Sequence, residues 1–303
     1  MTTEELIAAR RAEPWREALR KSKKNKERTD IPRVEMNELD AEYRSHTRLE
    51  EVNLGLTKEQ AMQEAQRCLD CPNPTCMQGC PVSINIPTFV KNIERGEFLE
   101  AARVLKETSA LPAVCGRVCP QEKQCESKCI HLKMGKPAVA IGYLERFAAD
   151  YERESGNISI PEVAEKNGIK IAVVGSGPAG LSFAGDMAKR GYDVTVFEAL
   201  HEIGGVLKYG IPEFRLPNKI VDVEIEGLRK MGVKFMTNCI VGKTISYDDL
   251  HADGFKGIFA ASGAGLPNFM NIPGENLVGV MSSNEYLTRV NLMDAANPDS
   301  DTP

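Results

Sequence analysis

Eight of the nine cysteines of this 303-residue chain lie between Cys68 and Cys129. They form two groups, the first spaced C-x2-C-x4-C-x3-C-P and the second C-x3-C-P-x4-C-x3-C. Thiolates are soft ligands that suit iron–sulfur clusters, and a Cys-Pro pair ends the cysteine run of bacterial two-cluster ferredoxins. Eight cysteines suffice for two [4Fe–4S] clusters, which this spacing therefore predicts. The groups are Cys68, Cys71, Cys76 and Cys80, then Cys115, Cys119, Cys125 and Cys129.

Two other uses of clustered cysteines fit this spacing less well. Structural zinc sites usually contain two close pairs of ligands, and only Cys68 and Cys71 form such a pair. A disulfide framework requires an oxidising compartment, whereas the N-terminus lacks the apolar core and cleavage site of a secretory signal. The ninth cysteine, Cys239, stands alone in an expected strand, and we interpret it as a packed core thiol.

A carboxylate joins these candidates through helical periodicity. In the helix expected from Val139 to about residue 152, Glu145 shares one face with Ile141, Leu144 and Ala148. A charge inside an apolar stripe is costly unless it has a partner. Two interpretations stay open: Glu145 forms a salt bridge at the edge of the stripe, or it ligates an iron of one cluster.

A glycine-rich loop provides the second chemical motif. The sequence at 175–180 is a G-x-G-x-x-G fingerprint that follows the expected strand 169–174 and opens a helix. Glu198 ends the next expected strand, 193–198, where it can accept hydrogen bonds from ribose hydroxyls. Such a βαβ unit binds the diphosphate of a dinucleotide at the helix N-terminus. The loop residues are Gly175, Ser176, Gly177, Pro178, Ala179 and Gly180.

This context predicts a dinucleotide site without separating FAD from NAD(P). Gly175 permits the tight turn, Gly177 lets the backbone approach the diphosphate, and Gly180 packs the helix against the sheet. A further Gly-Ala-Gly-Leu-Pro at 263–267 also follows an expected strand but leads into a loop broken by proline. We therefore expect a loop of the same cofactor site there, not a separate nicotinamide site.

The elements around these motifs predict an α + α/β chain of two domains. Residues 1–160 are expected to be helical, with an exposed helix and an extended arm over 1–50 and with the cysteines on loops that join helices. Residues 161–303 are expected to form the N-terminal part of a Rossmann-like domain with a parallel sheet. Its later elements are strands at 233–241 and 257–261 and a helix at 219–231.

The composition excludes several classes of function. The chain is 42% hydrophobic and 27% charged with a net charge of −5, which is typical of a soluble globular protein. This mild acidic balance gives no reason to propose nucleic acid or an anionic membrane as partner. The sequence contains no run of about 18 apolar residues, the length needed to span a bilayer. We therefore expect a cytoplasmic protein.

In combination, these motifs resemble one family. It comprises the small (β) subunit of NADPH-dependent glutamate synthase, the large subunit of NADH-dependent ferredoxin:NADP oxidoreductase and the N-terminal part of dihydropyrimidine dehydrogenase. The resemblance covers about residues 30–303. The segments that carry it are Arg67–Cys71, Gly79–Val82, Cys115–Pro120, Gly175–Gly180, Ile203–Leu207, Gly210–Pro217 and Ile272–Glu275.

The resemblance implies a set of cofactor ligands. FAD would lie at Gly175–Gly180 with Glu198 on its ribose, and Gly263 would close the strand that faces FAD. The other implied contacts are Gly204, Gly205 and Leu207 along the cofactor and Val241 near adenine. One cluster would be held by Cys68, Cys71, Cys76 and Cys129. The other would be held by Cys80, Cys119, Cys125 and a non-cysteine ligand that matches Glu145, which leaves Cys115 spare.

The activity that the resemblance implies is that of an oxidoreductase subunit. A nicotinamide hydride reduces FAD, and two clusters pass single electrons to a flavoprotein partner, either the glutamate synthase large subunit or a ferredoxin-reductase-like subunit. Family members continue with an NAD(P)H-binding domain, and this sequence stops about where that domain would begin. We therefore expect the chain alone not to oxidise NAD(P)H. The alternatives are the ferredoxin-linked large subunit and a truncated, non-catalytic electron-transfer fragment.

Overall fold

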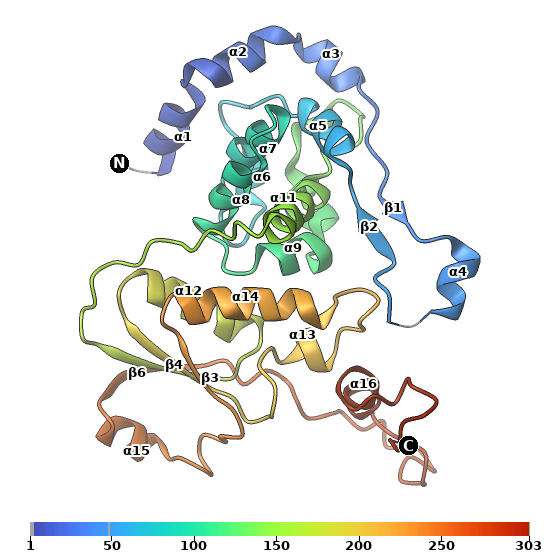
Figure 1. Ribbon diagram of the computed structural model, residues 1–303, viewed down its shortest axis with the longest axis vertical. Helices are drawn as coiled ribbons and strands as arrows, with labels where there is room; N and C mark the ends of the chain where they lie inside the picture. The colour runs from blue at the N-terminus through green and yellow to red at the C-terminus, as the bar shows by residue number, and fades with distance from the viewer. Residues whose placement is uncertain (1–2, 48, 303) are drawn as a thin grey trace. The chain divides into compact units, whose positions relative to one another are not determined.

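The computed structural model describes residues 3–47 and 49–302 (Figure 1). The chain divides into two compact units, which are Met1–Leu39 with Asn53–Pro161, and Asp40–Val52 with Glu162–Pro303. The first unit is helical apart from one short two-stranded sheet, and the second contains a four-stranded parallel sheet with helices. The expected α + α/β fold class is therefore confirmed.

The first unit begins with three helices and a short antiparallel pair of strands. The helices are α1 (Thr3–Arg11), α2 (Pro14–Ser22) and α3 (Asn25–Asp30). An extended stretch then forms β1 (Asn37–Glu38), which pairs with β2 (Asn53–Gly55). The part that carries the cysteines contains α5 (Lys58–Gln66), α6 (Thr75–Gln78), α7 (Ile86–Glu94), α8 (Phe98–Lys106), α9 (Pro112–Val118), η1 (Gln121–Lys123), η2 (Glu126–Lys128), α10 (Ile130–Lys133) and α11 (Ile141–Ser155).

Local signals in the sequence explain where these helices begin and pack. The capping box opens α5, because the Thr57 hydroxyl accepts a hydrogen bond from the Gln60 amide (3.2 Å) and the Gln60 side chain accepts one from the Thr57 amide (2.9 Å). The apolar faces of α8 and α11 meet at Phe98, whose ring lies edge-on to Phe147 (5.0 Å) and Tyr151 (4.9 Å). This packing fixes α8 against α11, the helix that carries Glu145.

The expectation of one exposed N-terminal helix is wrong, whereas the expected extended arm is present at residues 32–36, after α3. The region forms three helices, and the side chains of Arg16 and Arg28 are each only 1% exposed. Each arginine forms an ion pair with a buried carboxylate, Arg16 with Asp70 and Arg28 with Glu94. Charged residues usually face solvent, so their periodicity cannot reveal such pairs.

The expectation that the cysteines all lie on loops is wrong for two of them. Cys76 lies within α6 and Cys115 within α9. Both helices are short, four and seven residues, so they show too few turns for the hydrophobic period to be recognised. The other six cysteines of the two groups lie in turns or loops next to helix ends.

The close crossing of α9 and α11 depends on Gly116. A Cβ atom at Gly116 would lie 2.5 Å from the backbone nitrogen of Arg146 in α11. We expect Gly116→Ala to lower the free energy of unfolding by about 1–3 kcal/mol, the usual cost of overpacking. Gly227→Ala, in α14 (Asn218–Lys230), is the control, because its Cβ would meet no atom within 4 Å and alanine favours a helix. Thermal unfolding measures both, and an equal transition temperature in Gly116→Ala and the parent chain would contradict the prediction.

The second unit is built on a doubly wound parallel sheet with the strand order β5-β4-β3-β6. The strands are β3 (Lys170–Val174), β4 (Asp193–Phe197), β5 (Lys234–Met236) and β6 (Phe255–Ala260). Its helices are α4 (Ala41–His46), α12 (Pro178–Lys189), α13 (Val206–Tyr209), α14, α15 (Tyr247–Ala252) and α16 (Ser283–Leu292). Strand β5 is shorter than the expected strand at 233–241, because the chain turns at Asn238 with a φ of +55°. Cys239 follows this turn and packs in the core, 5% exposed.

None of the helices within residues 3–47 and 49–302 is long and apolar enough to cross a bilayer.

Candidate iron–sulfur and dinucleotide sites

The first candidate cluster site is a cavity lined by four cysteines in the first unit. Cys68, Cys71 and Cys76 come from the first cysteine group and Cys129 from the second. Apolar side chains complete much of the lining, including Leu69, Ile86, Val90, Val139 and Ile141. The structure thus brings together the four thiols that the resemblance assigns to one cluster. Four thiols in an apolar cavity are the donor set that a [4Fe–4S] cluster requires.

Burial opposes the ionisation of these thiols. Burial raises the pKa of Cys68 to about 11, against the opposing charge of Lys91. Burial also raises the pKa of Cys76 strongly, and the neighbouring thiols of Cys68, Cys129 and Cys71 raise it further. Because a coordinating thiol is deprotonated by its metal, the site suits a group that brings positive charge into the cavity.

The spacing of the donors differs from that around a single ion. Among the described residues, no three His, Cys, Asp or Glu side chains converge closely enough to hold one metal ion. The cysteines of a [4Fe–4S] cluster need no such convergence, since each binds a different iron. The four thiols instead lie around a common cavity.

The second candidate cluster site lies near Glu145 of α11, which is 5% exposed, and combines Cys80 of the first cysteine group with Cys115 and Cys125 of the second. Burial raises the pKa of Cys125 to about 12, and the negative charge of Glu145 adds to this shift. Burial likewise raises the pKa of Cys80, with further contributions from Glu145 and Cys119. A hydrogen bond with Cys119, burial and the charge of Glu145 all raise the pKa of Cys115. Cys115 and Glu145 therefore both interact with thiols of this set, and which of the two would complete it stays a prediction.

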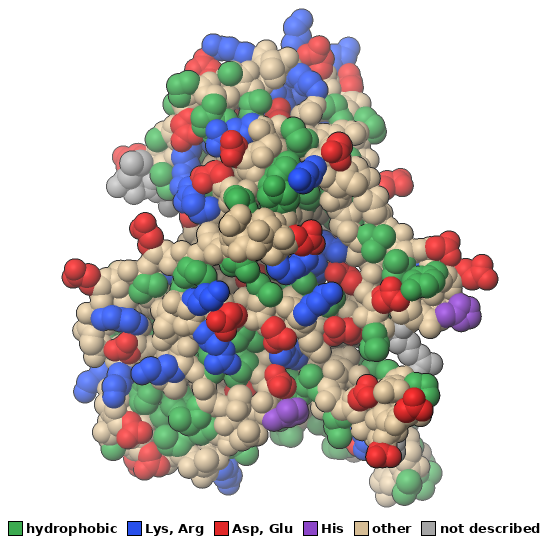
Figure 2. All heavy atoms as spheres, viewed as in Figure 1, with side chains coloured by type: hydrophobic (Ala, Val, Ile, Leu, Met, Phe, Trp, Pro, Cys, Tyr) green, Lys and Arg blue, Asp and Glu red, His purple; other side chains and the backbone are tan. Residues whose placement is uncertain are grey.

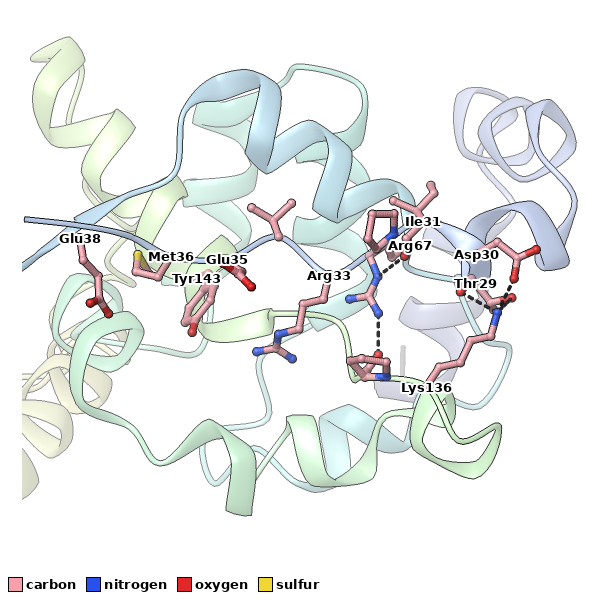
Figure 3. A pocket seen from close by; sticks show the side chains of 13 residues that line it. Thr29, Asp30, Ile31, Arg33, Glu35, Met36, Glu38, Arg67, Lys136 and Tyr143 are labelled. Atoms are coloured by element: carbon pink, nitrogen blue, oxygen red, sulfur yellow. Dashed lines mark hydrogen bonds and ion pairs between the residues drawn. The ribbon is translucent and has the colours of Figure 1, made fainter. Parts of the chain in front are cut away.

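A groove of about 830 Å³ lies next to the first cysteine group, beside the extended segment that follows α3 (Figure 3). The arginine and lysine side chains that line it form hydrogen bonds and ion pairs with other residues of the first unit. Arg67 donates to the carbonyl oxygen of Ile31 (3.1 Å), Lys136 pairs with Asp30, and Arg33 binds a carboxylate and a backbone carbonyl. These bonds attach the extended segment to neighbouring parts of the first unit, so we interpret the residues that line the groove as structural.

The predicted dinucleotide residues lie where the four parallel strands end. Gly175 follows β3, Glu198 follows β4, and Gly263 lies shortly after β6. Val241 lies beyond β5 and packs against the core of the second unit. The carboxyl ends of parallel strands form the edge at which doubly wound folds bind nucleotides.

Packing requires a glycine at two positions of the loop and leaves a third open. Gly175 has a φ of +102°, and a Cβ there would lie 2.4 Å from the carbonyl oxygen of Ala261. A Cβ at Gly180 would lie 2.0 Å from the carbonyl oxygen of Gly175. A Cβ at Gly177 would meet no atom within 4 Å. The loop therefore has an open face at Gly177, the N-cap of α12, where the backbone fits a diphosphate.

Glu198 has a second role that sequence reasoning missed. Its carboxylate is 6% exposed and accepts hydrogen bonds from the Ser176 amide (2.8 Å), the Ser176 hydroxyl and the Leu200 amide (2.9 Å). The Ser176 hydroxyl oxygen in turn accepts a hydrogen bond from the Gly204 amide (2.9 Å). Glu198 thus holds the glycine-rich loop in place through Ser176, whatever it offers to a ribose.

Three of the remaining predicted residues, Gly204, Gly205 and Leu207, lie on the segment behind this loop, whereas Gly263 follows β6. Gly205 has a φ of +52°, and a Cβ there would lie 2.8 Å from the Cα of Gly177. Leu207, in α13, is buried at 2% exposure. Gly263 is exposed, with a φ of +66°. The structure therefore places the Gly204–Gly205 turn directly against the loop.

Two family models match this chain in the order in which the two sites occur. Residues 44–157 match the family described as dihydropyrimidine dehydrogenase domain II, 4Fe-4S cluster. Residues 173–231 match the NAD(P)-binding Rossmann-like domain. The first match contains all eight clustered cysteines, and the second contains the glycine-rich loop and Glu198.

Several curated proteins are similar to this chain. The NAD-dependent dihydropyrimidine dehydrogenase subunit PreT of Escherichia coli K12 is 39% identical over 224 residues, covering 73% of this chain and 54% of that protein. The glutamate synthase (NADPH) small chain of Escherichia coli K12 is 37% identical over 229 residues, covering 75% and 48%. That of Azospirillum brasilense is 33% identical over 241 residues, covering 80% and 50%. The chain thus spans about half the length of these relatives.

Among solved structures, Mycobacterium tuberculosis FprA in complex with NADPH aligns with a TM-score of 0.36 and 24% identity, covering 40% of this chain and 28% of that chain. A similarity of this extent adds nothing to the assignment. The iron–sulfur match, the Rossmann-like match and the similarity to the curated proteins agree with one another. This chain belongs to the oxidoreductase family that contains the small chain of NADPH-dependent glutamate synthase and the PreT subunit of dihydropyrimidine dehydrogenase.

Proposed function

We propose that this chain is the iron–sulfur and flavin subunit of an oxidoreductase and relays electrons to a partner subunit. The observation that carries the proposal is the single cavity in which thiols from both cysteine groups meet. Two [4Fe–4S] clusters and FAD are the proposed cofactors. The first cluster would be held by Cys68, Cys71, Cys76 and Cys129, and the second by Cys80, Cys119, Cys125 and Glu145.

When bound, these groups would supply hydride acceptance at the flavin and single-electron transfer at the clusters. The protein's part is to bind, orient and shield them. The apolar lining of the first cavity limits the access of water to the cysteine sulfurs. In the second unit, the bonds from Glu198 to Ser176 keep the glycine-rich loop in the shape that a diphosphate needs.

The partner is inferred from the relatives. The names of the glutamate synthase small chain and of PreT describe them as parts of larger enzymes. We propose a flavoprotein partner subunit of the glutamate synthase large-chain or ferredoxin-reductase type. A dihydropyrimidine dehydrogenase partner is the second candidate, favoured by the 39% identity to PreT.

Metal analysis of anaerobically purified protein tests the cofactor assignment. We expect about eight irons and about eight acid-labile sulfides per chain, because eight cysteines occur at two-cluster spacing. Visible absorbance that bleaches with dithionite should accompany them. Stoichiometric zinc without labile sulfide would overturn the proposal.

A further inference from the structure

A buried ion pair fixes the loop between the first two cysteines. Asp70, between Cys68 and Cys71, has 0% exposure, and Arg16 of α2 has 1%. The Arg16 Nε lies 3.0 Å from Asp70 Oδ2, and a second guanidinium nitrogen also contacts the carboxylate. Arg20 of α2 donates to the same oxygen, Oδ2, at 2.7 Å. Two guanidinium groups of one helix therefore converge on this carboxylate.

Further cations bind the backbone of the same loop. The Arg11 Nε donates to the carbonyl oxygen of Asp70 at 3.0 Å. The Lys91 ammonium, with 0% exposure, donates to the carbonyl oxygen of Cys68. Asp70 itself has a φ of +51°, a left-handed conformation in which Asp and Asn are the best tolerated residues after glycine. The loop is thus held in a special conformation from several sides.

The charges that touch this loop are unequal. Four cations contact it directly, and two carboxylates pair with them: Asp70 with Arg16 and Arg20, and Glu94 with Lys91. The cations are Arg11, Arg16, Arg20 and Lys91. Reduction of a [4Fe–4S] cluster adds negative charge, and its potential responds to net charge, hydrogen bonding and solvent exposure. A local excess of positive charge in a buried region therefore favours the reduced cluster.

We propose that Arg16 and Arg20 are positioning residues by which the N-terminal helices raise the reduction potential of the cluster at Cys68, Cys71, Cys76 and Cys129. The inference rests on the proposed cluster and adds a role for a segment outside both cysteine groups. Arg16 and Arg20 act through Asp70, which lies within the ligand loop. The N-terminal helices thus set how readily this cluster accepts an electron.

Three substitutions separate this role from simple support of the fold. Arg16→Gln removes a positive charge, so the midpoint potential of the cluster should become more negative. Asp70→Asn removes a negative charge while keeping a residue that tolerates positive φ, so the potential should become more positive. Arg16→Lys keeps the charge and should stay close to the parent value. Merely structural support would move the first two potentials in the same direction, because both substitutions break the same ion pair.

The measurement is an EPR-monitored redox titration of the full chain, with iron and labile sulfide determined for each variant. The signal of this cluster is identified as the one lost in Cys71→Ser. Arg10→Gln is the matched control, because Arg10 lies on α1 and pairs with Glu107 (2.8 Å) without contacting the loop. Its potential should not shift.

Tryptophan fluorescence tests whether α2 keeps its position in the variants. Trp15, the sole tryptophan, lies on α2 with its ring centroid 3.8 Å from the Arg95 guanidinium, so its emission reports whether the helix stays docked. If Arg16→Gln fails to retain iron, Arg20→Gln decides, since Arg20 is 20% exposed and less costly to replace. Full iron with an unshifted potential in the deciding variant overturns the inference. Absence of iron and sulfide in the parent chain instead overturns the proposed function.

Discussion

Replacing Glu145 with alanine should reduce the iron content of the anaerobically purified chain from about eight atoms to about four. Glu145 is 5% exposed. Burial raises the pKa of Cys80 and of Cys125, and the negative charge of the nearby Glu145 raises both pKa values further. Its position also matches the non-cysteine ligand that the family resemblance implies. Loss of this ligand should release the second cluster and leave the cluster in the cavity of Cys68 and Cys129 intact.

Cys115→Ala is the matched comparison for Glu145→Ala. If Glu145 is the ligand, Cys115→Ala should keep nearly all of the iron, because its thiol then binds no iron and only forms hydrogen bonds with Cys119 and Ser109. Glu145→Cys should retain iron but shift the potential of the second cluster, since a thiolate donates more strongly than a carboxylate. Iron analysis and EPR of dithionite-reduced protein measure all three variants. Full iron in Glu145→Ala with cluster loss in Cys115→Ala would assign the ligand to Cys115.

Two alanine substitutions in the glycine-rich loop should fail in different ways. Gly180→Ala places a methyl group 2.0 Å from the carbonyl oxygen of Gly175, so it should destabilise the second unit by about 3 kcal/mol or more. Gly177→Ala meets no atom within 4 Å and should lower the thermal transition much less than Gly180→Ala, by the small cost of alanine at an N-cap. Its methyl group would nevertheless fill the open face of the loop, so FAD affinity should fall by at least about tenfold, or ~1.4 kcal/mol.

Circular dichroism melting and titration with FAD distinguish these outcomes. Leu181→Met, one residue beyond Gly180 in α12, is a control that changes a buried side chain of similar volume without touching the loop backbone. Unchanged FAD affinity in a folded Gly177→Ala chain would show that no diphosphate approaches this face.

Patterns local in sequence predicted most of both candidate sites. The cysteine spacing required no tertiary information, because the cysteines that hold iron–sulfur clusters recur at characteristic short separations in sequence. The strand, glycine loop and Glu198 likewise form one continuous motif of about 30 residues. The hydrogen bonds from Ser176 to Glu198 were missed. A carboxylate at the end of this strand is usually interpreted as a ribose ligand, so a structural role was not considered.

The charged residues around the first candidate cluster site could not be predicted. Arg16 and Asp70 are far apart in sequence, and each alone is a residue type expected at the surface. Their burial depends on the docking of α2, which no local period encodes. The positive φ of Asp70 could not be predicted either, although Asp is one of the residues that adopt positive φ most often after glycine.

Segment Asp40–Val52 has a consequence for the order of events during synthesis. It belongs to the second unit, where the Val52 amide donates to the carbonyl oxygen of Phe214 (2.9 Å). A ribosome adding 5–20 residues per second makes Phe214 on the order of 10–30 s after Val52. Pairing of β1 with β2 joins the chain on either side of the segment, so the nascent first unit can close around its cysteines while the segment waits as a tethered loop. The first unit, with the proposed cluster ligands, can therefore fold before the nucleotide-binding sheet has left the ribosome.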